Sequence, residues 1–471
     1  MFLLTYVLPE QNAYATMHGA NSMDNFLLIT TDSLRADHVG YHGYERNVTP
    51  EIDALAERGS RFTNAFSHVG GTRFSFPGIL SGVTPMMYGG HERIADGQTL
   101  IPEVFHDAGY RTGGFHSNLY VSGRFGYDRG WNEFYDSAPN ESSVSRLRKW
   151  AKTNLDGVAL ELLRRGYNLL ESSQGINVGS YHVPADELTD RAIEFVKQAP
   201  EEPTFLWVHY MDVHHPFLPP AEYQRLFRDT PITHEESIRL RRKFIEEPDS
   251  VTDEEYQEFI DLYDAAIRFN DAEIGRLVGA VEEQWCDDYL LAFTSDHGDH
   301  FLEHGFFGGV RLRNVKNHVP LFITGWDDTA TYDELVGLTD LPSTLVDRAG
   351  LDVPNNWFGD SLRDLVFDGD WERTDVIGGY RDRDGTEHIR VREMDWKLIT
   401  HEDGPDELYH LATDPEERTN VIHEYPEEER RLRDRLGEHR RLVEATASES
   451  LERPDMDEEV KERLRRLGYK E

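Results

Sequence analysis

Residues 288–298 read DYLLAFTSDHG, a continuous apolar run that leads directly into an aspartate, a histidine and a glycine. An uninterrupted run of this kind is typical of an interior strand of a parallel sheet, which is buried on both faces. Four other stretches have the same character: residues 26–32, 110–118, 203–212 and 319–325. Segments of helical periodicity separate them, most clearly over residues 254–284. The alternation predicts an α/β fold with a large, mostly parallel sheet sandwiched by helices.

The character of the chain changes after about residue 345, where short strand candidates alternate with turns. This pattern predicts a smaller C-terminal α+β subdomain with a short antiparallel sheet. The final residues are rich in opposite charges spaced four apart, as in solvated helices. We therefore divide the chain into an N-terminal extension outside the folded domain (1–22), the large α/β domain (23–345), the C-terminal subdomain (346–425) and charged C-terminal helices (426–471).

The composition is strongly acidic, with 88 acidic and 49 basic residues and a formal net charge of −39. We expect no nucleic-acid partner, because nucleic-acid phosphates would be repelled. The acidic residues are spread along the whole chain, and Arg supplies most of the positive charge. This balance is typical of proteins from a high-salt cytoplasm, where ions screen self-repulsion.

Two observations bear on the compartment. No run of about 18 apolar residues occurs, so we expect no transmembrane helix. The apolar stretch near the N-terminus has no basic region before it, so no export signal is evident and we expect a cytoplasmic protein. The single cysteine, Cys286, rules out an intramolecular disulfide.

Polar side chains stand at or just beyond the ends of three predicted strands. They are Asp32, then His209 with Asp212 and His214, and then Asp296 with His297. Because the carboxyl ends of parallel strands meet at one edge of a sheet, we expect Asp32, Asp296 and His297 to converge. Mixed carboxylate and imidazole ligands suit one divalent cation, and the sequence leaves Ca²⁺, Mg²⁺, Mn²⁺ and Zn²⁺ open.

A series of motifs carries a family resemblance. In chain order they are NFLLITTDSLRADHVGYHGY, SFPGILSGVTP, DVHHPFLPP, FTSDHGDHFLEHG, HVPLFITG and DELYHLATDPEERTNVI. This order, from about residue 24 to about residue 423, resembles the sulfatase family of the alkaline-phosphatase superfamily. The resemblance implies a metal-dependent hydrolase or transferase acting on sulfate or phosphate esters. With the acidic composition, it suggests a haloarchaeal member of that family.

The resemblance also implies roles for individual residues. Asp32, Asp296 and His297 fall on metal-ligand positions of the family, and His214 falls on a histidine that contacts the anionic group or the leaving group. Three further residues are weaker candidates for contact with the substrate anion, namely His209, Lys316 and His318.

The nucleophile position departs from the family pattern. Sulfatases of this family carry C-x-P-S-R or S-x-P-S-R, whose first residue is oxidised to formylglycine. Aligning ILSG (79–82) with the family's LLTG places Thr72 at that position, and Thr cannot undergo this oxidation. We therefore expect no formylglycine and expect Thr72 to act as nucleophile and metal ligand. Pro77 suggests that a helix begins there, after an anion-binding turn, and Arg73 would replace the motif's arginine as an anion clamp.

Three hypotheses remain open from the sequence. The first is a hydrolase or transferase that forms a covalent intermediate on Thr72, which favours phosphate esters. The second is a sulfatase in which water or Thr72 attacks directly. The third is a degenerate family member that binds an anionic glycan without turnover. The substrate would be an anionic ester, such as a sulfated or phosphorylated glycan or lipid, and the sequence does not address the oligomeric state.

Overall fold

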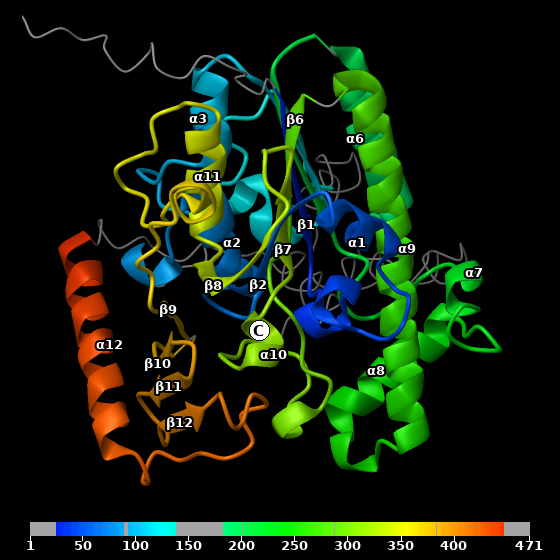
Figure 1. Cartoon of the computed structure of the whole chain (residues 1–471). Coiled ribbons are helices and arrows are strands. Elements are labelled where there is room, and N and C mark those ends of the chain that lie inside the picture. The colour runs from blue at the N-terminus through cyan, green and yellow to red at the C-terminus, as the bar shows by residue number, and fades with distance from the viewer. Residues whose placement is uncertain are drawn as a thin grey trace, which may run out of the picture.

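The computed structural model describes residues 25–88, 93–137, 182–199, 201–286, 288–382 and 384–446. At its centre lies an eight-stranded sheet in the order β4-β3-β5-β1-β6-β7-β2-β8 (Figure 1). The strands are β1 (Asn25–Thr31), β2 (Gly59–Phe66), β3 (Arg111–His116), β4 (Glu133–Tyr135), β5 (Thr204–Tyr210), β6 (Tyr289–Ser295), β7 (Leu321–Thr324) and β8 (Thr331–Gly337). The expected extension over 1–22 and the last part of the charged C-terminal segment, 447–471, lie outside the described residues.

All five strands predicted from apolar runs are present, as β1, β3, β5, β6 and β7. Five of the seven neighbouring strand pairs in this sheet are parallel. The other two are the pairs of β7 with β6 and β2, and both are antiparallel. The start of β7 therefore lies at the edge where the parallel strands end: Leu321 pairs with Thr294 near the end of β6. The edge strand β8 was not predicted, because its first half is largely exposed and polar.

Helices cover both faces of the sheet. They are α1 (Pro50–Ala56), α6 (Ala185–Gln198) and α9 (Asp253–Trp285) on one face, and α2 (Thr72–Ser81), α3 (Ile101–Asp107) and α11 (Asp340–Arg348) on the other. Alternating residues of β1 supply both cores: Leu27 and Ile29 pack with the first group, and Phe26 and Leu28 with the second. Because both faces of β1 are buried, its sequence is a continuous apolar run.

The long helix α9 matches the segment predicted over residues 254–284. It begins with a capping box, in which the Thr252 hydroxyl accepts the Glu255 N–H at 3.2 Å and the Glu255 carboxylate accepts the Thr252 N–H at 2.9 Å. Two shorter helices, α7 (Ala221–Gln224) and α8 (His234–Glu246), precede it. Within the described ranges, no helix combines the length and apolar character needed to cross a membrane.

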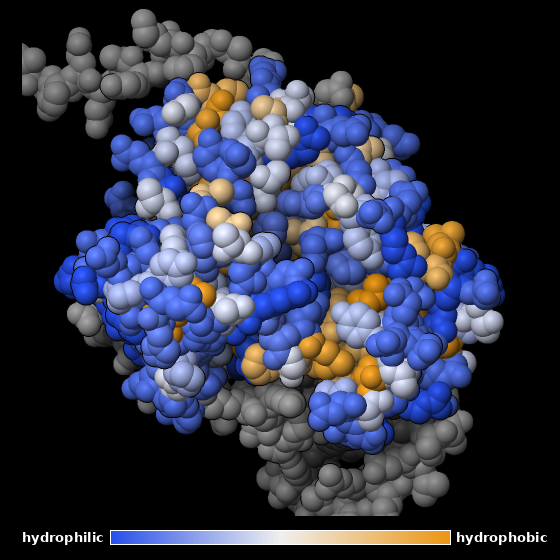
Figure 2. Space-filling model, turned by 60° about the horizontal axis from the view of Figure 1, so that its bottom comes forward, coloured by the Kyte–Doolittle hydropathy of each residue, from blue (hydrophilic) through white to orange (hydrophobic). Residues whose placement is uncertain are grey.

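The predicted C-terminal antiparallel sheet is also present, in the order β12-β11-β10-β9. Its strands are β9 (Val376–Arg381), β10 (Glu387–Arg392), β11 (Trp396–His401) and β12 (Glu407–His410). Helix α12 (Pro426–Thr446) packs Leu432 and Leu436 onto one face. The other face meets the large domain, where Tyr380 packs with Phe74 of α2. Figure 2 shows that the surface is mostly hydrophilic, with one group of apolar side chains beside the middle of the face in view.

Candidate active site

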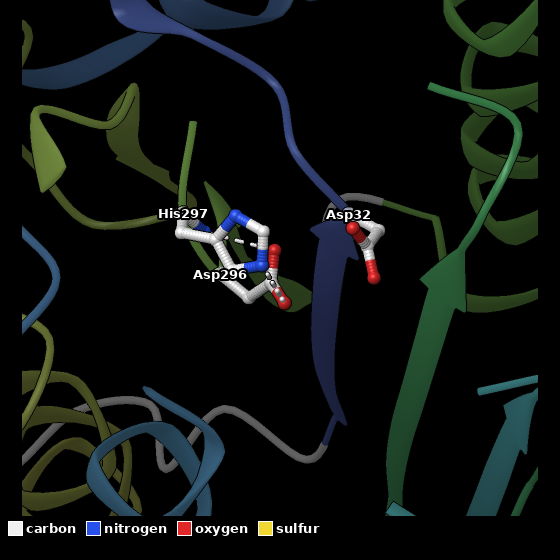
Figure 3. A group of neighbouring side chains, drawn as sticks. All are labelled: Asp32, Asp296 and His297. Atoms are coloured by element: carbon white, nitrogen blue, oxygen red, sulfur yellow. Dashed lines mark hydrogen bonds and ion pairs between the residues drawn. The ribbon is translucent and has the colours of Figure 1, made fainter. Parts of the chain in front are cut away.

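Two neighbouring strands of the central sheet place two aspartates side by side. Thr31 of β1 pairs with Ser295 of β6, so the residues that follow them, Asp32 and Asp296, leave the sheet at the same level. Ligand atoms of Asp32, Asp296 and His297 all lie within 4.8 Å of one another, and all three residues are buried (Figure 3). The expected convergence of these strand ends is therefore present in the structure.

The hydroxyl of Thr72 completes this cluster. Thr72 Oγ1 donates to Asp32 Oδ2 at 3.2 Å and lies 3.3 Å from His297 Nε2. Helix α2 begins at Thr72 itself, so the expectation that Pro77 opens the helix is wrong: Pro77 lies inside it. The difference has a functional consequence, because Thr72 now stands at the positive end of the helix dipole, where negative charge is stabilised.

The turn that carries Asp32 is held from several sides. Ser33 has φ = 62°, in the left-handed region, and its hydroxyl donates to Asp32 Oδ1 at 2.6 Å. The Ser33 N–H donates to Asp296 Oδ1 at 3.2 Å. From α9, the Tyr263 hydroxyl donates to the Ser33 carbonyl at 2.8 Å and accepts the Arg35 N–H at 3.0 Å. Backbone strain is thus balanced by fixed contacts, as is common at functional sites.

Asp32 carries a firmly ionised carboxylate. Burial alone would raise its pKa, but the neighbouring His214, His209 and His297 hold that pKa well below its usual value. The Asn118 side chain also donates to Asp32 Oδ2, at 2.9 Å. Asn118 follows β3, and we did not predict it, although its place just beyond a strand end was the available signal.

His209 lies behind Asp32, with a fully buried ring. The Trp207 indole N–H donates to Thr30 Oγ1 at 3.0 Å, and Thr30 Oγ1 lies 3.0 Å from His209 Nδ1. The Thr30 hydroxyl can then donate to Nδ1, which leaves the His209 proton on Nε2, 3.7 Å from Asp32 Oδ2. His209 is therefore placed to orient Asp32 and not to contact a substrate, in contrast to its expected role.

Asp296 provides a buried carboxylate oxygen. Its Oδ2 lies 3.6 Å from His297 Nε2. Burial and the nearby Asp32 raise the pKa of Asp296 well above its usual value, because two close carboxylates resist ionising together. Two carboxylates, an imidazole Nε2 and a hydroxyl form a donor set that fits a divalent cation, which would relieve this repulsion.

A second group of charged residues borders the cluster. Lys316 is buried, and its Nζ donates to Asp299 Oδ1 at 2.9 Å. The positive charge of Lys316, after burial itself, lowers the pKa of His297 to about 4, so Lys316 lies close to the cluster. The buried His214 interacts electrostatically with both Asp32 and Asp299. Lys316 and His214 therefore lie near the cluster, and their contact with a substrate stays a prediction.

The C-terminal subdomain fixes the short helix α10 (Asn314–Asn317) that carries Lys316. Lys397 of β11 is fully buried, pairs with Glu417 at 2.5 Å and donates to Asn314 Oδ1 at 3.0 Å. Glu417 Oε2 accepts the Asn314 N–H at 2.7 Å. Arg390 of β10, also fully buried, donates to the Asn317 side chain. The charged residues of this small sheet therefore act on the site through α10.

The structure does not bring His318 to the cluster. Its Nε2 pairs with the Thr63 carbonyl at 2.8 Å, and its ring stacks on Phe66 with centroids 5.0 Å apart. Arg73 is half-buried next to Thr72, with its guanidinium 4.6 Å from the Phe74 ring centroid. Sequence spacing placed both residues near the site but could not show the direction of either side chain.

One residue at the site, His182, was not predicted. His182 Nε2 lies 4.0 Å from Asp212 Oδ1, and the charges of His214 and Asp32 both influence the pKa of His182, which burial lowers to about 4. Asp212 accepts the N–H of Ala185 at the start of α6, at 3.2 Å. His182 lies in a connecting segment with no pattern around it, so the sequence offered no signal.

Comparison with known proteins gives a consistent result. Residues 24–351 match the model of the family described as Sulfatase, and residues 302–442 match that described as N-sulphoglucosamine sulphohydrolase, C-terminal. An arylsulfatase of Clostridium perfringens is 25% identical, over 86% of this chain and 91% of that protein. The human iduronate 2-sulfatase is 25% identical, over 70% of each.

Solved structures show the same fold. The phosphonate monoester hydrolase of Agrobacterium radiobacter has a TM-score of 0.67 and 21% identity, over 89% of this chain and 95% of that one. A protein solved with its substrate D-glucosamine-2-N,6-O-disulfate has a TM-score of 0.69 and 19% identity, over 89% and 98%.

The sheet order and the helical layers define the alkaline-phosphatase-like fold. The chain belongs to the sulfatase family. It is a sulfatase-like hydrolase, and the hypothesis of a non-catalytic binding protein finds no support.

Proposed function

We propose that this enzyme cleaves sulfate or phosphate esters through a covalent intermediate on Thr72, with one divalent cation held by Asp32, Asp296, His297 and the Thr72 hydroxyl. The observation that carries the proposal is the position of Thr72 Oγ1, in contact with both Asp32 and His297. A bound cation would lower the pKa of the hydroxyl and offset negative charge on the ester.

Each step follows from the groups in place. Asp32 accepts the Thr72 proton, and Oγ1 forms a bond to sulfur or phosphorus as the bond to the leaving oxygen breaks. His214 donates a proton to the leaving oxygen, while Lys316 and Arg73 bind the non-bridging oxygens. Water then attacks the sulfur or phosphorus atom and gives a proton to His214. As the bond to Oγ1 breaks, the proton held by Asp32 returns to Oγ1 and restores the Thr72 hydroxyl.

The substrate class follows from the relatives and from Thr72. One similar solved protein is described with a glucosamine disulfate substrate, a relative is described as an iduronate sulfatase, and another neighbour as a phosphonate monoester hydrolase. We infer a sulfated or phosphorylated sugar. A threonine ester cannot collapse as a formylglycine hemiacetal ester does, so its release needs attack by water or an acceptor alcohol, which favours phosphorus.

A substrate panel tests the proposal. The enzyme would be assayed in high salt with Mn²⁺ on 4-nitrophenyl sulfate, 4-nitrophenyl phosphate and bis(4-nitrophenyl) phosphate, with and without glycerol as an acceptor. Turnover of at least one ester that Thr72→Val abolishes supports the proposal. Turnover that survives Thr72→Val means that water attacks directly, and no turnover of any ester overturns the proposed activity.

A further inference from the structure

Arg311 is fixed beside the loop that presents the nucleophile. Its backbone forms an antiparallel bridge with Gly70, two residues before Thr72. A Cβ on Gly71 would lie only 3.0 Å from Val310 Cγ2, so the two segments are in close contact. The position of Arg311 relative to the start of α2 is therefore set by the backbone.

The guanidinium of Arg311 keeps donors available. One face lies 4.4 Å from the centroid of the Phe306 ring, and Nη1 donates to the Val310 carbonyl at 2.8 Å. A further hydrogen bond joins Arg311 to the Tyr380 hydroxyl. Within the described ranges no Asp or Glu forms an ion pair with Arg311. Since a guanidinium has five N–H donors, its edge can still bind an anion in bidentate fashion.

The C-terminal subdomain also contacts the region around Arg311, through Tyr380. Tyr380 of β9 lies 5.7 Å from Phe74 of α2, measured between ring centroids. Burial raises the pKa of Tyr380 to about 12, so its hydroxyl stays protonated. This hydroxyl donates to the Val310 carbonyl at 3.3 Å and so helps to hold Arg311 in position. Arg73 and Arg311 both influence Tyr380 electrostatically, which places all three around the same end of α2 as Thr72.

We propose that Arg311 and Tyr380 form a subsite for a second anionic group of the substrate, a sulfate, phosphate or carboxylate, so that the enzyme selects doubly charged sugars. This rests on the proposed function, in which Thr72, Lys316 and Arg73 engage the reacting ester. Arg311 lies in the segment before α10 and is not needed for the reacting ester. Its positive charge is therefore available to bind a second anionic group. The small antiparallel sheet, through Tyr380, then takes part in substrate selection.

The competing explanation is electrostatic. With a net charge of −39, the protein repels every anion, and a cation near the entrance would help any anionic substrate equally. The two explanations differ in one measurable quantity, the ratio of the affinities for matched anions that carry one and two charges.

Calorimetric titration measures this ratio without requiring turnover. The probes are benzenesulfonate and the 1,2-, 1,3- and 1,4-benzenedisulfonates, at one fixed ionic strength because salt screens charge. At least one disulfonate should bind the wild type about tenfold more tightly than benzenesulfonate, as one charge-assisted contact provides. Arg311→Ala should remove this preference, Arg311→Lys and Tyr380→Phe should reduce it, and benzenesulfonate should bind all variants alike.

A charge-matched control is Arg58→Ala. Arg58 is half-exposed and directly precedes β2. It therefore lies at the opposite end of this strand from the loop that leads to Thr72. It should leave the preference unchanged. Equal weakening of mono- and disulfonates by Arg311→Ala, or a wild type without preference, overturns the subsite. If the ester panel shows no turnover but the preference exists and depends on Arg311, the proposed reaction fails while the subsite stands.

Discussion

Thr72 Oγ1 donates a 3.2 Å hydrogen bond to Asp32 Oδ2, although 40 residues separate the two in sequence. The bond depends on two independent features, a turn after β1 and a helix start after β2. It directs the hydroxyl proton toward a carboxylate whose pKa is held low, which leaves an oxygen lone pair for an electrophile. This geometry supports the proposal that Thr72 acts as the nucleophile without oxidation.

Replacing Thr72 separates the hydroxyl from the shape of the side chain. Thr72→Val keeps the branched shape and removes Oγ1, so kcat/KM should fall at least about a thousandfold on the ester that the wild type prefers. Thr72→Ser keeps the hydroxyl and should retain most of the activity. Thermal unfolding of both variants serves as the control for folding. Comparable activity of Thr72→Val and wild type contradicts a nucleophilic Thr72.

Asp296 should couple stability to metal binding. The Tm of the wild type should be higher in excess Mn²⁺ than in EDTA. A ligand at one hundred times its Kd adds about 2.7 kcal/mol to the free energy of unfolding. Asp296→Asn removes one ligand charge and the repulsion from Asp32, so it should be at least as stable without metal and gain little with it. Exposed Asp333→Asn provides the control. A metal-induced shift in Asp296→Asn equal to that of wild type excludes Asp296 as a ligand.

His209 should tune metal affinity through Asp32. The amide nitrogen of His209→Gln can take the place of Nε2 and still donate to Asp32, whereas His209→Ala cannot. We expect His209→Ala to raise the Kd for Mn²⁺ about 10- to 100-fold, as loss of an outer hydrogen bond to a ligand does, and His209→Gln to restore most of the affinity. Calorimetric titration reports both values. If the Gln variant binds as weakly as the Ala variant, His209 acts by packing alone.

The cluster of Asp32, Asp296 and His297 could be predicted because it depends on strand ends. Parallel strands end at one edge of the sheet, and the register of β1 with β6 places Asp32 next to Asp296. Lys316 reaches the same edge for the opposite reason, since it precedes the antiparallel β7. An apolar run such as residues 319–325 has the same appearance in either direction, so the resemblance, and not the pattern, pointed to Lys316.

Side-chain direction was the part that the sequence could not provide. His209 faces Asp32 and His318 faces Thr63, and nothing in the spacing distinguishes them. Which face a strand residue uses depends on its register with neighbours far away in the chain. Polar edge strands such as β8 lack a continuous apolar run and were missed for that reason.

Glu417 should connect the C-terminal subdomain to the site. Glu417→Gln leaves buried Lys397 without its ionic partner, which should cost about 3–5 kcal/mol in the free energy of unfolding. The double variant Glu417→Gln with Lys397→Met removes both charges and should recover much of that loss. Because Glu417 caps the helix that carries Lys316, the single variant should also lower kcat/KM. Urea unfolding measures the stability, with exposed Glu416→Gln as the control. Equal stability of the single and double variants contradicts a role for the pair.

Asp212 should make the stability of the fold depend on pH. Burial raises the pKa of Asp212 to about 7, against an ordinary value of 3.8, so the folded protein binds more protons than the unfolded chain between about pH 4 and pH 7. The contribution of Asp212 to the free energy of unfolding therefore falls as pH rises through this window. Asp212→Asn cannot ionise, so its stability relative to wild type should increase by roughly 2–4 kcal/mol from pH 4 to pH 8.

The measurement is urea unfolding at a series of pH values, each in the same high salt. Asp333→Asn removes the same charge from an exposed position in β8 and should change stability by less than about 0.5 kcal/mol across the series. A constant difference between Asp212→Asn and wild type from pH 4 to pH 8 contradicts a raised pKa. Because Asp212 accepts the Ala185 N–H and lies beside His182, its ionisation acts on the start of α6 and on the site together.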